Sequence, residues 1–196
     1  MRNESLTDLC FSKTDEELVA MALSNQDCFV RIVERYEKKL LSYIIRISGF
    51  SKEDAEDVLQ EVFIKTYINL NSFDGNLKFS SWIYRITHNE VINNYRKKKA
   101  RPQCVMDLDD EFLNNLASDF RTDGRADAQY LKENVSGVME KLEPKYREVL
   151  ILRFWEDKDY NEISDILKKP MGTVATLISR AKANFQKELE RQSINL

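Results

Sequence analysis

Apolar residues recur every three to four positions along two long stretches of the chain, which is the period of an amphipathic α-helix. The first stretch holds four apolar stripes, one around Leu18, a longer one over 29–47, a third over 55–67 and a fourth from about Ser80 to Tyr95. Four stripes of this kind predict a four-helix domain, because each must bury its apolar face against the others.

Residues that favour helix ends stand between these stripes. Thr14 and Glu17 have the spacing of a capping box ahead of the first helix. Gly49 follows the second helix, where glycine commonly takes a left-handed conformation, and Ser51 can cap the third. A polar loop from Asn71 to Lys78 precedes the fourth.

The second periodic stretch begins near Ala128 and predicts a helix to Leu142, then one that starts at Pro144 and runs through Phe154. Asp159 and Glu162 can cap a short helix, a tight turn over 168–171 follows, and a last helix carries apolar residues over 174–189. Two helices joined by about four residues have the geometry of a helix-turn-helix, although other helical hairpins share this spacing.

Residues 102–124 are acidic and weakly periodic, which favours an extended connector. The sequence thus predicts an all-α protein of two small helical domains, 1–101 and 128–196, joined by a flexible acidic linker over 102–127. Glycine numbers 5 and proline 3 in 196 residues, which disfavours a turn-rich all-β fold.

The net charge of −3, taken alone, argues against nucleic-acid binding. Counted by segment, residues 1–30 carry −4, residues 31–101 carry +5, residues 102–130 carry −5 and residues 131–196 carry +1. The total therefore hides a basic block that is compatible with DNA binding.

Several classes of protein are disfavoured. The first residues lack the pattern of a signal peptide, and no stretch is apolar enough to cross a membrane, so we expect a cytoplasmic protein without membrane insertion. Cys10, Cys28 and Cys104 are far apart, so neither a disulfide framework nor a zinc site is favoured, and His88, the single histidine, leaves little for His-based metal sites or Ser-His-Asp catalysis. We expect no metal, no cofactor and no enzymatic activity.

Three stretches together resemble one family. They are DAEDVLQEVFIKTYINL at 54–70, FSSWIYRITHNEVINNYRKKK at 79–99, and LEPKYREVLILRFWEDKDYNEISDILKKPMGTVATLISRAKANFQKEL at 142–189. In this order they are similar to regions 2 and 4 of bacterial RNA polymerase sigma factors of the extracytoplasmic-function (ECF) group. The resemblance implies a subunit that binds core RNA polymerase and promoter DNA, and an anti-sigma factor that inhibits it.

Acidic residues share one face of the predicted third helix. A solvated surface is the simplest interpretation, and a carboxylate metal site would need Glu-x-x-His pairs that the sequence lacks. The resemblance implies docking onto the clamp helices of the polymerase's largest subunit, with the flap as a second contact. The docking residues are Asp54, Asp57, Gln60 and Glu61.

The loop at 71–78 and the helix after it combine polar, aromatic and basic residues, as a groove for single-stranded DNA does. The resemblance implies that this loop receives a base flipped out of the −10 element. Trp82 and Tyr95 lie on the apolar stripe, which favours the core for both. The expected −10 contacts are Phe73, Asp74, Gly75, Asn76, Lys78, Tyr84, Arg85, Asn89, Arg96, Lys97 and Lys98.

The resemblance implies that the last helix binds the −35 duplex. Many members of the family have glycine where this chain has Lys168, and basic residues where it has Ala175 and Leu177, so its base readout is expected to differ. The expected −35 contacts are Lys168, Lys169, Gly172, Thr173, Thr176, Ser179, Arg180 and Lys182. The alternative is a stand-alone helix-turn-helix regulator with a helical sensor domain, which would leave the basic fourth helix unexplained.

Overall fold

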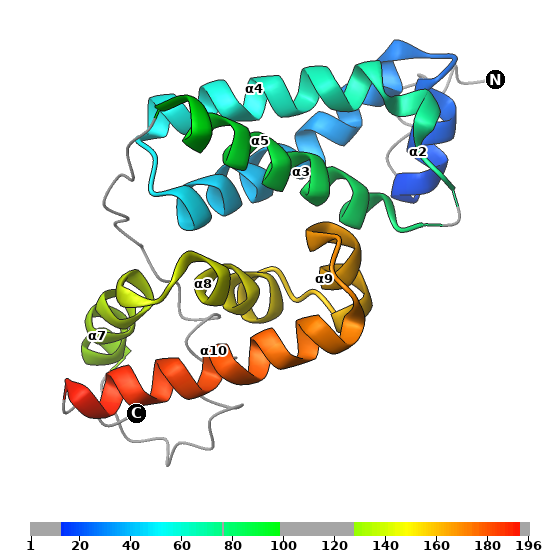
Figure 1. Ribbon diagram of the computed structural model, residues 1–196. Helices are drawn as coiled ribbons and strands as arrows, with labels where there is room; N and C mark the ends of the chain where they lie inside the picture. The colour runs from blue at the N-terminus through cyan, green and yellow to red at the C-terminus, as the bar shows by residue number, and fades with distance from the viewer. Residues whose placement is uncertain (1–12, 76, 99–127, 193–196) are drawn as a thin grey trace. The chain divides into compact units, whose positions relative to one another are not determined.

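The computed structural model describes residues 13–75, 77–98 and 128–192, and every element of regular structure within them is helical (Figure 1). The all-α prediction is confirmed. Contacts divide the chain into two compact units, Met1–Ile44 with Ser51–Ala100 and Ile45–Phe50 with Arg101–Leu196. The predicted linker at 102–127 lies outside the described residues. None of the described helices is long and apolar enough to cross a membrane.

The first group of helices comprises α2 (Asp15–Ala22), α3 (Gln26–Ser48), α4 (Lys52–Ile68), a 3₁₀ turn (Leu70–Ser72) and α5 (Phe79–Lys98). The predicted ends are confirmed: Thr14 and Glu17 form the capping box, and the Ser51 hydroxyl accepts from the Asp54 N–H. Gly49 has a φ of 68°, the left-handed conformation that glycine adopts without steric cost.

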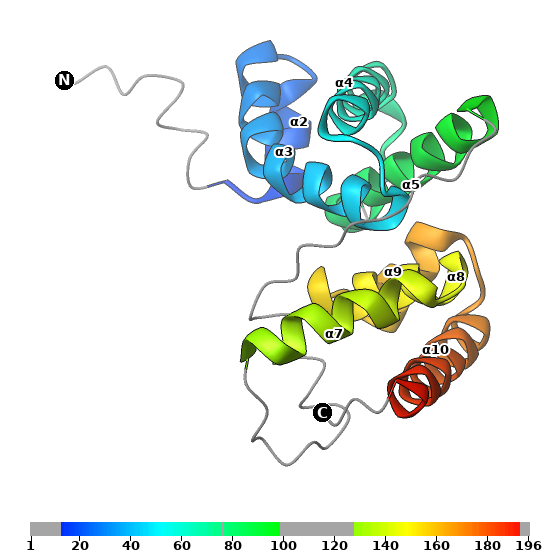
Figure 2. The ribbon, with the colours of Figure 1, turned by 90° about the vertical axis from the view of Figure 1, so that its left-hand side faces the viewer.

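These helices enclose a core of aromatic and branched side chains. The fully buried ones include Leu18, Ile32, Leu40, Tyr43, Ile44, Phe79, Ile83 and Tyr84. Helices α4 and α5 pack against each other, and α2 packs against α5 (Figure 2). The first turns of α5 bury a wide face, and Ser81–Tyr84 are all buried.

The second group comprises α7 (Ala128–Lys141), α8 (Pro144–Leu150), a π-helical segment (Ile151–Trp155), α9 (Tyr160–Leu167) and α10 (Met171–Arg191). Pro144 starts α8 as predicted. The single helix predicted from Pro144 to Phe154 instead changes to wider turns at Ile151, where the Glu156 N–H donates to the Ile151 carbonyl five residues earlier.

The helix-turn-helix pattern is present in α9 and α10. Asp159 and Glu162 form the predicted capping box of α9, and Pro170 stands directly before α10. Helix α10 packs against α7, α8 and α9 through its buried residues, which are Val174, Ile178, Ala181, Phe185 and Leu189. The opposite face of α10 is left at the surface.

Candidate functional site

The outer face of α4 is acidic. Asp57, Gln60 and Glu61 are exposed and Asp54 is half-buried, while Val58 and Val62 between them face the core. Among the described residues Asp57 and Glu61 have no ion-pair partner, so two carboxylates of this face are available to a basic surface. The structure brings the four expected polymerase-binding residues onto one helix.

The described residues contain no group of three or more histidine, cysteine, aspartate or glutamate side chains placed to hold a metal ion. The acidic residues of α4 therefore line a surface and do not converge on a point within the described part of the chain.

The loop between α4 and α5 is anchored at both ends. Leu70 is buried, and the Phe73 ring packs edge-on against Phe79, with centroids 5.4 Å apart, and lies 5.5 Å from Trp82. The Leu77 N–H donates to the Asp74 carbonyl at 2.9 Å, which closes a turn between the anchors. The loop is thus held by aromatic packing at its base and by a backbone turn at its tip.

The polar residues of this loop lie at the surface. Asp74, Gly75 and Lys78 are exposed, Phe73 is half-buried, and Asn76 lies outside the described residues. A Cβ atom placed on Gly75 would meet nothing within 4 Å. Sequence reasoning did not single out Phe79, the fully buried residue that anchors this loop. The sequence feature that could have indicated this anchor is an aromatic residue directly before the predicted start of the helix.

Along α5 the expected contact residues differ in exposure. Asn89, Arg96 and Lys97 are exposed, Arg85 is half-buried, and the side chain of Lys98 lies outside those described. Trp82 is 6% exposed, which confirms its predicted place in the core, and Tyr95 is half-buried.

Tyr84 corrects the sequence prediction. It was expected to contact DNA, but it is 2% exposed and its ring lies 5.0 Å from that of Tyr43 in α3. The physical reason is that Ser81–Tyr84 are four consecutive buried residues, so the buried face of α5 is wider here than the apolar stripe. Tyr84 belongs to the core.

The outer face of α10 presents a row of small and polar residues. Gly172, Thr173, Thr176, Ser179 and Arg180 are all exposed. The Thr176 hydroxyl donates to the Gly172 carbonyl at 2.8 Å, and a Cβ atom on Gly172 would meet nothing within 4 Å. The glycine is thus not required by packing within the described residues.

The lysines around the helix-turn-helix have different surroundings. Lys168 and Lys169 are exposed in the turn, whereas Lys182 is half-buried with its ammonium group 5.4 Å from the centroid of the Phe154 ring. Lys168 has a φ of 51°, a left-handed conformation. Glycine adopts this conformation without steric cost, so the backbone at this position favours glycine. Ala175 and Leu177 are half-buried.

Both groups of helices match models of known protein families. The family model for sigma-70 region 2 matches residues 32–101, and that for sigma-70 region 4 matches residues 132–185. The ECF RNA polymerase sigma factor SigW of Bacillus subtilis (strain 168) is 37% identical over 172 residues, which cover 84% of this chain and 90% of the relative.

The chain belongs to the ECF group of sigma factors. It is a promoter-directing factor of transcription initiation. The ECF RNA polymerase sigma-E factor of Escherichia coli (strain K12) is also similar, with 31% identity over 90% of this chain and 95% of the relative.

Solved structures agree with this fold. The structure of CnrH in complex with the cytosolic domain of CnrY matches this chain with a TM-score of 0.65 and 25% identity. The match covers 91% of this chain and 99% of the chain in that structure. The sigma factor RpoE of Bartonella quintana, in complex with the anti-sigma factor NepR, matches with a TM-score of 0.60 and 19% identity, over 83% and 96% of the two chains.

Proposed function

We propose that this sigma factor acts by binding alone, with three surfaces for three partners and no catalytic site. The acidic face of α4 docks on core polymerase, the loop at 71–78 with α5 holds unpaired bases of the −10 element, and α10 binds the −35 duplex. The single observation that carries the proposal is the match of both family models, in order, on the two groups of helices.

The docking surface is supported by charge and exposure. Asp57, Gln60 and Glu61 form an uninterrupted polar row along α4, and a helical surface of the polymerase with basic residues would complement it. Complementary charge accelerates association and fixes the orientation of the partners. The clamp helices of the largest subunit are the partner that the family resemblance implies.

The −10 surface is supported by the arrangement of its loop. Capture of a flipped base requires contacts that offset a few kcal/mol of lost stacking and pairing. The exposed Asp74, Gly75 and Lys78 offer polar groups and accessible backbone, while Arg96 and Lys97 offer charges for phosphates. Arg85 and Asn89 lie on α5 between the loop and these basic residues, and they supply further contacts to the DNA strand. Phe73 serves as an anchor of the loop.

The −35 surface is supported by the exposed row on α10. Small side chains at Gly172 and Thr173 allow the helix to enter a groove closely, and the first amides of the helix suit a phosphate oxygen. Arg180 reaches base edges or phosphate, while Thr176 and Ser179 add shorter polar contacts. Lys168, Lys169 and Lys182 supply attraction that does not depend on sequence.

Other partners follow from the family. CnrH and RpoE, the structural neighbours, are each in complex with another protein, the cytosolic domain of CnrY and the anti-sigma factor NepR. We infer an anti-sigma factor for this chain as well, a polymerase flap contact, and an acidic linker that follows the basic RNA exit path of polymerase. Cytoplasmic location without a cofactor or membrane insertion fits these roles.

Two substitutions test the surfaces separately. Asp57→Lys is expected to lower the affinity for core polymerase about tenfold while the protein stays folded by circular dichroism. Glu37→Lys, an exposed charge reversal on α3, is the control and should change that affinity less than twofold. Equal affinities for the two variants would contradict the docking surface.

Arg180→Ala is expected to weaken binding of the holoenzyme to the −35 duplex by about 5- to 100-fold and to leave polymerase association intact. Lys187→Ala, further along α10 and also exposed, is the control. The sigma-factor role itself fails if the pure protein binds duplex DNA specifically and never associates with core polymerase.

A further inference from the structure

The N-terminal end of α2 is fixed by its own capping box. The Thr14 hydroxyl accepts from the Glu17 N–H at 3.2 Å, and the Glu17 carboxylate accepts from the Thr14 N–H at 2.8 Å. This reciprocal pair satisfies backbone donors that the helix cannot. The two carboxylates between them, Asp15 and Glu16, are left to contact other helices.

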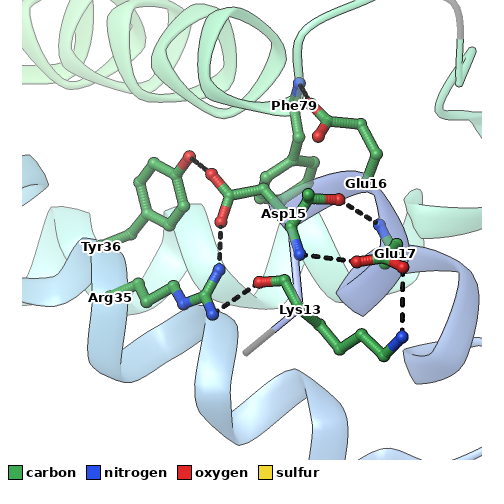
Figure 3. A network of polar contacts seen from close by, with 8 residues as sticks. Lys13, Asp15, Glu16, Glu17, Arg35, Tyr36 and Phe79 are labelled. Carbon is green, nitrogen blue, oxygen red and sulfur yellow. Dashed lines mark hydrogen bonds and ion pairs between the residues drawn. The ribbon is translucent and has the colours of Figure 1, made fainter. Parts of the chain in front are cut away.

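Asp15 ties this end of α2 to α3. Arg35 donates from Nη1 to Asp15 Oδ1 at 2.8 Å, and the Tyr36 hydroxyl donates to Oδ2 (Figure 3). Arg35 also donates from Nη2 to the Lys13 carbonyl at 2.8 Å. Tyr36 is buried, whereas the Arg35 and Asp15 side chains are partly exposed, and together these contacts hold the N-terminal end of α2 on α3.

Glu16 reaches the first residue of α5. Its Oε1 atom accepts from the backbone N–H of Phe79 at 2.9 Å, across 63 residues of sequence (Figure 3). Phe79 begins α5, and the first N–H groups of a helix have no acceptor within it. A carboxylate at this end also interacts favourably with the helix dipole. Glu16 therefore caps α5 from a different helix.

The side chain of Phe79 links this cap to the −10 loop. Its ring is fully buried and lies edge-on to Tyr36 at 5.6 Å and to Phe73 at 5.4 Å. Phe73 is the aromatic anchor of the loop. The backbone of Phe79 is thus held by Glu16, and its ring holds the loop, so a shift at one contact reaches the other.

We infer that Glu16 is a positioning residue for promoter opening, which fixes the start of α5 so that the loop at 71–78 is ready to receive an unpaired base. The inference rests on the proposed function of that loop. A loop held in its bound arrangement loses less conformational entropy on binding, so base capture is stronger when the contact is intact.

The test uses holoenzyme formed with core polymerase and the non-template −10 strand of a promoter identified by mapping transcription starts. Affinity for the strand with its flipped base is compared with affinity for the same strand with an abasic site there. Glu16→Ala is expected to reduce this preference about three- to tenfold. A smaller folded fraction lowers the amount of active protein but leaves the preference unchanged.

Two variants serve as controls. Glu16→Gln keeps an oxygen acceptor for the Phe79 N–H and should retain the preference within twofold. Glu17→Ala breaks the capping box of α2 without touching α5, and should also retain it. If wild type prefers the intact base and Glu16→Ala does so equally, this inference is wrong. If wild type shows no preference, the proposed role of the loop is wrong, and the inference falls with it.

Discussion

Lys65 of α4 and Glu90 of α5 form an ion pair with 2.5 Å between Nζ and Oε1. Glu90 is 4% exposed, and the same Oε1 atom accepts from the Asn93 side chain at 3.1 Å. This contact connects the helix with the acidic face to the helix that follows the −10 loop. A buried carboxylate needs such partners, because an unpaired one would be costly in the interior.

Removal of the lysine should therefore destabilise the fold. We expect Lys65→Met to lower the free energy of unfolding by about 1–3 kcal/mol, less than for a fully buried pair because the Lys65 side chain is partly exposed. Urea denaturation measures this. Lys52→Met breaks the exposed pair with Glu56 and should cost less than about 0.5 kcal/mol. Equal losses in the two variants would contradict the account.

Lys168 predicts a stabilising substitution. Its φ of 51° is unfavourable for a residue with a Cβ atom, so Lys168→Gly should raise the free energy of unfolding by about 0.5–1 kcal/mol. Lys169→Gly removes the same charge next door, where φ is not positive, and should lower stability. Thermal denaturation of the two variants measures these changes. A loss of stability in both would show that the left-handed conformation of Lys168 does not strain the fold.

A substitution at Gly172 is expected to change the affinity for DNA without lowering the stability of the fold. Gly172→Ala should leave the free energy of unfolding equal or raise it by up to about 1 kcal/mol, since a Cβ atom there meets nothing within 4 Å. The added methyl group should nevertheless weaken holoenzyme binding to the −35 duplex, measured by fluorescence anisotropy. Gly137→Ala in α7 is the matched control, with equal room around it and no expected effect on DNA binding.

Tyr36 predicts a loss of stability at high pH. Burial, reinforced by the hydrogen bond to Asp15, raises the pKa of its phenol far above the ordinary value of 10.0. The folded protein keeps this proton above pH 10 while the unfolded chain releases it. The contribution of the Tyr36 phenol to the free energy of unfolding is therefore present in full below pH 10. It falls above pH 10, by at most about 1.4 kcal/mol per pH unit.

The measurement is the difference in unfolding free energy between wild type and Tyr36→Phe from pH 8 to 11. Phenylalanine has no proton to lose, so we expect a constant difference up to about pH 9 and a decreasing one above pH 10. A difference that stays constant to pH 11 would show that the phenol is not held in its neutral form by the fold.

Most helix ends were predictable because their signals are local. Thr14 with Glu17 and Asp159 with Glu162 form the expected capping boxes within four residues of sequence. The π-helical segment was not predictable, since the apolar pattern of Ile151–Phe154 is the same for either kind of turn. Such a segment is decided by backbone hydrogen bonds that the side-chain pattern does not record.

The exposure of the candidate site residues could be predicted on helices that bury a single face, and less well on other helices. On α10 the residues expected at the surface, from Gly172 to Arg180, are exposed. On α5 the helical stripe failed at Tyr84, because the four consecutive residues Ser81–Tyr84 are all buried there. The contact of Glu16 with Phe79 joins residues far apart in sequence, and only the packing of α2 on α5 brings them together.

We propose that this chain directs core polymerase to promoters through two DNA-binding surfaces. The most direct test maps transcription starts on genomic DNA of the source organism, with core polymerase alone and with the protein added. We expect new start sites that share a −35 and a −10 element at fixed spacing, and weaker use of these sites with Asp57→Lys. Start sites identical to those of core polymerase alone would contradict it.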